Sequence, residues 1–437
     1  MKKYLLSLSL MAFSLIIFAQ SGTNSPYSMY GLGVISDQSN GAGRGMNGVG
    51  LAFREGNQIN YLNPASYSSV DSLTFIFDIG MSLQNTNFKA GNSKVNAKNA
   101  NFEYAIAGFR ALRHFGMAFG ILPYTNIGYD FSSKGDTIKD YTMYPNTEER
   151  TTLTNTYSGS GGLHQIFIGG GWEITKGLSV GANVSYLWGT LDRGVTNTYS
   201  DSYVRASIKA YNQDVSSYKL DFGAQYYKNI NKNDVLTVGV TYSPGHKLGS
   251  NAELLTISVN SGSAIADTTL SKAAGGYSIP TQFGLGFGYA HGKKWRAGLD
   301  YTLQKWGSIE AIPYKMNRAP NSIVGYTNSY TDRHKINFGG EYCKNVNSRR
   351  FSERIRWRAG ASYTTPYLKI NGKDGPKEIS VSAGAGIPII NAYNNRSILN
   401  VGLQWTNQSG SFITENTIRL NIGLTFNERW FAKWKFE

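Results

Sequence analysis

Segments of about 10 residues in which apolar positions alternate with polar or glycine positions recur from Leu73 to the C-terminus. Alternation with a period of two is typical of β-strands that have one face in lipid and the other face in a lumen. In residues 295–304, one parity reads Trp, Ala, Leu, Tyr and Leu, and the other reads Arg, Gly, Asp, Thr and Gln. The pattern predicts an all-β chain.

The alternation predicts about 14 strands, an even number as in bacterial single-chain barrels. They cover residues 73–83, 102–110, 115–124, 163–174, 178–188, 218–227, 235–243, 281–290, 295–304, 334–342, 355–364, 378–388, 398–406 and 417–427. The links after even-numbered strands are short. Most links after odd-numbered strands are long and are predicted to be loops, namely 125–162, 189–217, 244–280 and 305–333.

This asymmetry between the two ends favours a transmembrane antiparallel β-barrel with periplasmic turns and extracellular loops. A soluble sandwich or propeller has strands that alternate too, but its loops are of similar length at both ends. Aromatic residues such as Trp357 and Tyr363 end several strands on the outward parity, as in interfacial girdles. The outer membrane of a Gram-negative bacterium is the expected location, and a final aromatic parity, Trp430 to Phe436, resembles an assembly signal of such barrels.

Three regions are predicted along the chain. Residues 1–19 have the charged, apolar and small-residue order of a signal peptide. Residues 20–72, which are rich in Gly, Asn and Ser, form an N-terminal plug in the lumen, and residues 73–437 form the barrel. Glycines recur on the lumen parity, where they either ease curvature or leave room for another backbone. They are Gly181, Gly223, Gly239, Gly284, Gly286, Gly298, Gly339, Gly360, Gly384, Gly402 and Gly423.

Composition narrows the function classes. The formal charge is +15, but the basic residues lie in turns and an exported chain rarely meets nucleic acid, so no nucleic-acid partner is expected. The single cysteine, Cys343, excludes an intramolecular disulfide, and the five histidines lack the paired spacing of a metal site. Nucleophile motifs are absent. We therefore expect neither an enzyme, a cofactor nor a metal.

Three runs resemble the FadL-type outer-membrane transport family. They are residues 45–53, residues 60–65 directly before the first strand, and the Gly/apolar alternation of residues 116–124 that runs into proline and an aromatic residue. Together they cover roughly a quarter of the chain, and the rest of the resemblance is one of architecture. The motif residues carried over are Asn63, Pro64 and Ala65 in the plug, and Pro123 and Tyr124 in the third strand.

The resemblance implies passive uptake of hydrophobic or amphipathic molecules such as fatty acids, which bind in the lumen and leave through a gap beside a kinked third strand. Proline lacks an amide donor, so Pro123 is expected to mark the kink, unless pairing ends there anyway. Candidate lumen contacts for a ligand carboxylate are Lys219, Lys335, Arg358 and Arg419, although salt bridges to neighbouring strands or to the plug are the alternative use of such cations.

Two other functions stay open. Some barrels resembling this family, such as the shuttle protein of type IX secretion, are subunits of secretion or assembly complexes, and an open porin is a third hypothesis. A transporter requires an apolar pocket that leads to a wall gap, whereas a subunit requires stable partners. Expected partners are outer-membrane lipid and lipopolysaccharide, hydrophobic small molecules and, for a subunit, other outer-membrane or periplasmic proteins.

Overall fold

A computed structural model describes residues 22–139, 150–200, 204–259, 266–273, 277–309, 329–370, 372–389 and 397–428. The predicted signal peptide and the aromatic C-terminal residues lie outside these ranges. None of the described helices is long and apolar enough to cross a membrane.

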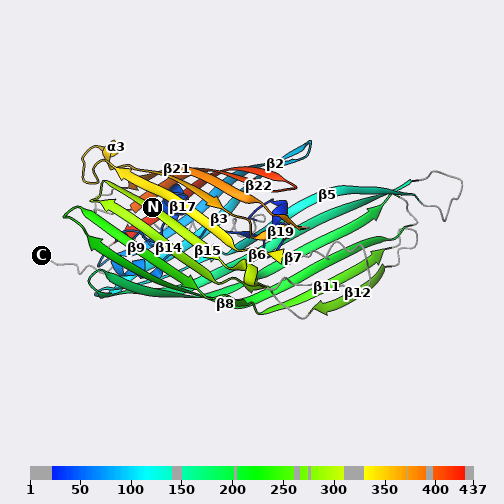
Figure 1. Ribbon diagram of the computed structural model, residues 1–437, viewed down its shortest axis with the longest axis horizontal. Coiled ribbons are helices and arrows are strands. Elements are labelled where there is room, and N and C mark those ends of the chain that lie inside the picture. The colour runs from blue at the N-terminus through cyan, green and yellow to red at the C-terminus, as the bar shows by residue number, and fades with distance from the viewer. Residues whose placement is uncertain are drawn as a thin grey trace, which may run out of the picture.

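The described chain forms a closed antiparallel barrel of 14 strands, as predicted, in which β4 and β5 together make the third strand (Figure 1). The barrel closes because β2 pairs with β23 from Phe75↔Glu428 to Lys89↔Thr414. Its strands are β2 (Phe75–Ala90), β3 (Ser93–Leu112), β4 (Phe115–Pro123), β5 (Thr125–Lys139), β6 (Arg150–Thr175), β7 (Leu178–Tyr199), β8 (Ala206–Asn229), β9 (Asp234–Ser243), β14 (Gln282–His291), β15 (Trp295–Gln304), β17 (Arg333–Cys343), β18 (Arg356–Thr364), β21 (Lys377–Ile389), β22 (Ser397–Ser409) and β23 (Thr414–Glu428).

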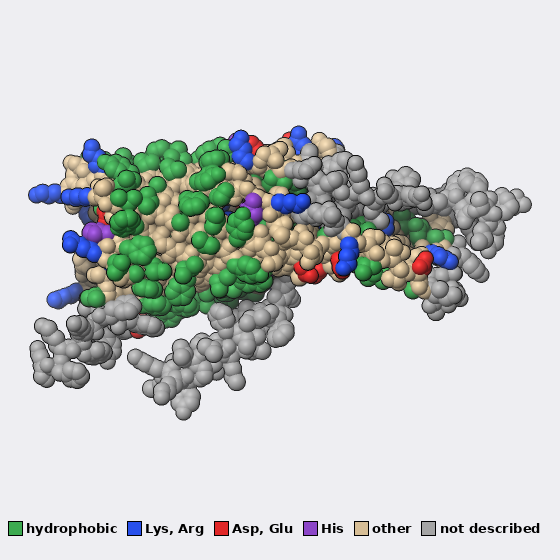
Figure 2. All heavy atoms as spheres, turned by 90° about the horizontal axis from the view of Figure 1, so that it is seen from below, with side chains coloured by type: hydrophobic (Ala, Val, Ile, Leu, Met, Phe, Trp, Pro, Cys, Tyr) green, Lys and Arg blue, Asp and Glu red, His purple; other side chains and the backbone are tan. Residues whose placement is uncertain are grey.

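Side-chain alternation separates an apolar outer face from a packed inner face. In β14, Phe283, Leu285 and Phe287 are exposed on the outside, whereas Gly284 and Gly286 are buried. Figure 2 shows the exposed hydrophobic side chains as a band over the part of the barrel nearest the short turns, with Lys and Arg gathered at that end. A contiguous apolar belt of this kind fits contact with lipid.

Three of the four predicted long loops, 125–162, 189–217 and 244–280, are largely strand where the structure describes them, which corrects the sequence interpretation. Most of the fourth, 305–333, lies outside the described residues. Strands β6, β7 and β8 have 26, 22 and 24 residues, whereas a membrane-spanning strand needs about 10. With β5, β11 (Ser250–Val259) and β12 (Ala266–Ala273) they continue beyond the apolar belt as a polar sheet (Figure 1). These extensions are rich in Thr, Ser and Asn and lack an apolar outer parity, so the lipid-face pattern did not reveal them.

Smaller elements close the interior where the barrel meets this extension. They are β10 (His246–Lys247), β13 (Ser278–Ile279), η3 (Trp306–Ser308), β16 (Ser329–Tyr330), β19 (Leu368–Ile370) and β20 (Lys373–Asp374), while α3 (Phe351–Arg354) lies in a short turn. Trp306 packs with Leu163, Leu187 and Leu191 of the long strands in a buried apolar cluster that also contains Leu32. The interior at this level is therefore a hydrophobic core.

Residues 22–71 form an irregular segment with four short elements: η1 (Pro26–Met29), β1 (Val34–Ile35), α2 (Gly41–Gly45) and η2 (Pro64–Ser69). The Asn40 side chain accepts a hydrogen bond from the Gly43 amide at the start of α2, and Asn63 does the same for Ala65 at the start of η2. Most residues from Ser39 to Ala52 are buried. We call residues 22–71 the N-terminal segment below.

Candidate functional site: a filled barrel with an interrupted wall

The N-terminal segment packs its backbone against the inward-facing glycines. A β-carbon placed on Gly360 would lie 2.4 Å from the carbonyl carbon of Met46, and one on Gly239 would lie 2.0 Å from the carbonyl oxygen of Leu51. All eleven lumen-parity glycines singled out in the sequence lie within contact distance of this segment. The missing side chains therefore make room for another backbone.

Asn63, Pro64 and Ala65 lie at the centre of this packing. The Asn63 amide donates to the Leu51 carbonyl at 2.9 Å and to the Ala224 carbonyl of β8 at 3.2 Å. Pro64 rests on the bare backbone of Gly181 in β7. The motif thus joins the segment both to itself and to the wall.

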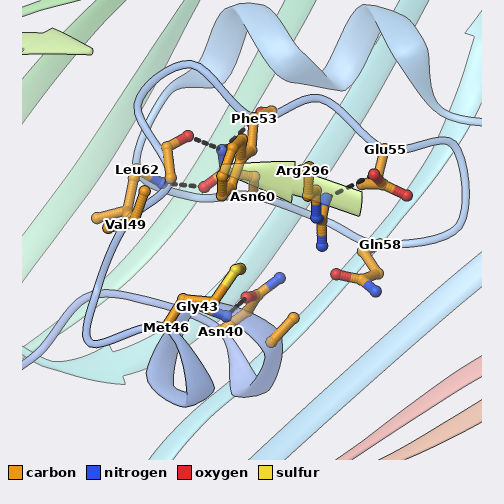
Figure 3. Close-up of a pocket in the computed structure, with 12 residues that line it drawn as sticks. Asn40, Gly43, Met46, Val49, Phe53, Glu55, Gln58, Asn60, Leu62 and Arg296 are labelled. Carbon is orange, nitrogen blue, oxygen red and sulfur yellow. Dashed lines mark hydrogen bonds and ion pairs between the residues drawn. The ribbon is translucent and has the colours of Figure 1, made fainter. Parts of the chain in front are cut away.

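Charged wall residues hold the segment through its backbone and side chains. The Asp300 carboxylate accepts hydrogen bonds from the Gly50 amide at 2.6 Å and the Leu51 amide at 2.9 Å. Figure 3 shows Arg296 of β15 reaching Glu55 of the segment, with 2.5 Å between Nη1 and Oε1. Between these contacts the segment leaves a cavity of only about 20 Å³, little more than one water molecule needs.

The third strand is interrupted beside Pro123. On one side, β4 and β5 both pair with β6, and the Tyr124 amide donates to the Leu163 carbonyl at 2.7 Å. On the other side, the ladder between β3 and β4 ends at Ala105↔Ile121, and the β3 residues before Ala105 pair with β2. Because amides alternate in direction along a strand, the donor that Pro123 lacks would point toward β3.

A pair of glycines in β6 allows this interruption. Gly161 and Gly162 have φ values of +103° and +139°, which L side chains rarely adopt. A β-carbon on Gly162 would lie 2.3 Å from the Thr125 carbonyl oxygen. Opposite Tyr124, the backbone of β6 therefore changes direction, and its pairing partner changes from β4 to β5.

The N-terminal segment covers the interrupted edge. Strand β1 pairs with β5 through Val34↔Asn126 and Ile35↔Thr125. Next to it, the side-chain amide of Gln38 donates to the Pro123 carbonyl at 2.9 Å. The Pro123 carbonyl, which lies where the ladder is interrupted, therefore has a hydrogen-bond partner. The same segment thus contacts both the inner face of the wall and the interrupted edge.

The segment also reaches the opposite edge of the interruption. The Gly22 carbonyl accepts hydrogen bonds from Asn101 of β3 at 2.7 Å and Gln84 of β2 at 3.1 Å. A β-carbon on Gly22 would lie 2.6 Å from the Asn126 side-chain oxygen of β5. Gly22 therefore contacts both sides of the interruption, β2 and β3 on one side and β5 on the other.

The four predicted ligand cations are placed differently from one another. Arg358 is buried, and donates to Glu341 at 2.6 Å and to Asn400 at 2.6 Å. Lys219 pairs with Asp221, and Arg419 donates to Gln84 at 3.2 Å. Lys335 makes no ion pair within the described residues, and its Nζ points toward the Gly48 turn.

The residues of the N-terminal segment that bind the barrel wall were not identified from the sequence. Glu55, Arg44 and Gln38 come from a stretch without periodicity, so no local pattern assigned them a direction. Arg44 forms a buried ion pair with Glu103 of β3. The one available signal was compositional, since charged residues within a Gly-rich and Asn-rich filler require partners in the lumen.

Comparison with known proteins gives the family. The sequence matches the BamG family over residues 1–437. The chain belongs to the BamG family. No curated protein matches the sequence.

Several solved structures share the fold of this BamG-family chain. The Pseudomonas putida toluene transporter TodX aligns with a TM-score of 0.60 and 14% identity over 91% of this chain and 100% of its own. The Ralstonia pickettii toluene transporter TbuX gives 0.58 and 14% over 89% and 98%. A Pseudomonas aeruginosa FadL homologue gives 0.58 and 13% over 90% and 98%. The FadL-type architecture predicted from the sequence is confirmed, and at these identities the likeness concerns the fold.

Proposed function

We propose that this chain is a closed, non-conducting barrel in the outer membrane of a Gram-negative bacterium, where it serves as a subunit of a secretion or assembly complex. The observation that carries the proposal is the packing of the N-terminal segment against the inner glycines. To open a passage for solute, the backbone of the N-terminal segment would have to break its contacts with nearly every strand.

The polar sheet beyond the apolar belt supports the same proposal. Strands β5, β6, β7, β8, β11 and β12 present a broad, mainly polar surface, and β11 pairs with β8 from Ser250↔Val215 to Val259↔Ala206. A groove of about 480 Å³ lies on this sheet among Asp130, Asp192 and Asn212. Because it is wide and polar, such a surface suits contact with a partner protein better than capture of an apolar ligand.

The second candidate function is passive uptake of hydrophobic or amphipathic molecules such as fatty acids, with sideways exit beside Pro123. The interrupted ladder between β3 and β5 favours it, as does the fold shared with toluene transporters. In this candidate, residues 22–38 leave the interruption during each transport event. Lys335 is then the cation best placed to meet a ligand carboxylate.

Purification from the native membrane in a mild detergent, followed by mass analysis of proteins and lipids, tests the proposal. A complex subunit comes out with partner proteins in fixed ratio to the barrel. A barrel that comes out alone and loaded with fatty acids or other apolar molecules overturns the proposal in favour of uptake.

A further inference from the structure

The short-turn end of the barrel contains a basic pocket that the filled interior does not use. It has a volume of about 420 Å³ and lies between the 291–295 turn, α3 and the 55–57 turn of the N-terminal segment. This volume is within the range of small-ligand sites. Lys293, Lys294, Arg296, Arg354 and Arg356 line the pocket, against three carboxylates, those of Glu55, Asp71 and Glu341.

Two of these arginines keep a buried guanidinium nitrogen without a hydrogen-bond partner among the described residues. Arg296 is 8% exposed, and its Nε has no hydrogen-bond partner among the described residues. The Nε of Arg354 also lacks a partner there, although its guanidinium lies 5.8 Å from the Phe351 ring. A guanidinium that lacks acceptors is costly to bury, so additional negative charge beside it is favoured.

The remaining charges of the pocket do not neutralise it. Glu341 is shared by Arg296, Arg356 and Arg358, at 3.3, 3.1 and 2.6 Å. Glu353, next to Arg354, pairs with Lys344 at 2.9 Å. Within the described residues, no carboxylate lies in ion-pair distance of Lys293, Lys294 or Arg354, so the mouth keeps an excess of positive charge.

Glu55 shows which chemistry this pocket accepts. Its carboxylate is 2.5 Å from Nη1 of Arg296 and 3.9 Å from Nη1 of Arg356, while its side chain remains 30% exposed. It belongs to a turn of the N-terminal segment and not to the wall (Figure 3). A carboxylate from outside the barrel wall is therefore already bound in the pocket, and its partial exposure leaves a position where another can compete with it.

We propose that this pocket binds the carboxylates of an acidic polypeptide segment presented from the periplasm, in competition with Glu55. The inference deepens the proposed function, because it gives the chemistry of a partner contact, and it rests on that function for the identity of the polypeptide as a complex component. Displacing Glu55 would loosen the 55–57 turn, so partner binding and the seating of the N-terminal segment are coupled.

Binding of a fluorescent hexaglutamate peptide to the full-length barrel in a neutral detergent, followed by anisotropy at low salt, tests the proposal. Saturable binding that hexaglutamine does not show is expected. Arg354→Gln and Lys294→Gln, which leave the N-terminal segment untouched, should each weaken binding by about 3-fold to 10-fold.

The Glu55→Gln variant gives the sharper readout. Removing the internal carboxylate should tighten peptide binding by about tenfold, because the Arg296 and Arg356 donors become available. Glu173→Gln, which removes one charge from the end of β6 beside a short turn and outside the pocket, is the matched control and should change affinity little. Equal effects of the two variants would mean a general surface attraction and would overturn the proposal.

Two competitors separate other ligands from a polypeptide. Inorganic phosphate at the peptide's own concentration should displace little of it, and micelles containing phosphatidylglycerol should likewise leave it bound. Full displacement by either one would reassign the pocket to a free anion or to lipid. If native purification recovers partners but the peptide does not bind, only this inference fails, whereas the proposed subunit function stands.

Discussion

Arg44 and Glu103 join the N-terminal segment to β3 through a buried ion pair, with 3.0 Å between Nη2 and Oε2 and side chains 3% and 7% exposed. Glu103→Ala leaves the Arg44 charge buried without its partner, which costs about 3–5 kcal/mol. Because the strand ladders remain, the segment should detach while the barrel stays folded. Limited proteolysis of the purified barrel, read as cleavage within residues 22–71, measures this.

The Arg44→Met/Glu103→Leu double variant is the control for that ion pair. Removing both charges avoids the unpaired guanidinium, so much of the protease resistance should return. A double variant that is cleaved as fast as Glu103→Ala would show that the pair does not hold the segment.

Replacing two inner glycines by alanine should lower the stability of the barrel at one position and leave it unchanged at the other. In Gly360→Ala, the new carbon meets the Met46 backbone at 2.4 Å, so something must shift, at a cost of about 1–3 kcal/mol. In Gly402→Ala, the nearest atom is the α-carbon of Gly45 at 3.7 Å, an ordinary contact. Thermal unfolding in one detergent should give a lower Tm for Gly360→Ala alone, and equal Tm values would argue against a filled lumen.

Two outward residues of strand β17 predict that the cost of an introduced arginine depends on its depth in the lipid. Phe338 and Tyr342 are 60% and 50% exposed on its outer face, Phe338 near the middle of the strand and Tyr342 next to its end. Phe338→Arg should destabilise the barrel in vesicles by about 2–4 kcal/mol, and Tyr342→Arg by about 0–1 kcal/mol. Urea unfolding measures both, and a larger penalty at Tyr342 would contradict the placement of the apolar belt.

The barrel could be predicted because its signal is local. Alternation in segments such as 282–289 reports directly which side chains face lipid, and it gave the strand order and number. The extensions of β6 to β8 could not be found in this way, because their outward positions are mainly polar, as at Thr154, and give no apolar alternation. Their strand pairing is visible only in the register with neighbouring strands.

The interior was predictable in part. The lumen glycines indicated that something passes close to the wall, and Pro123 indicated where a ladder ends. The contacts that decide the site are long-range, as in Glu55 with Arg296 or Gln38 with Pro123. Such contacts depend on how an aperiodic segment folds within the barrel, which no spacing along the chain encodes.

A disulfide between the N-terminal segment and the interrupted wall tests the central claim most directly. Val34 and Asn126 are paired residues of β1 and β5, so their α-carbons lie about 4.5–5.5 Å apart, within disulfide reach. Val34→Cys/Asn126→Cys in a Cys343→Ser background should form the bond on oxidation. Each single cysteine variant, and the reduced double variant, serve as controls.

With the segment locked in place, partner proteins should copurify in the same ratio from oxidised and reduced cells, and entry of an apolar probe compound should be the same in both. Probe entry that stops on oxidation and returns on reduction would contradict the proposal of a closed barrel, and would make the N-terminal segment the moving gate of a transporter.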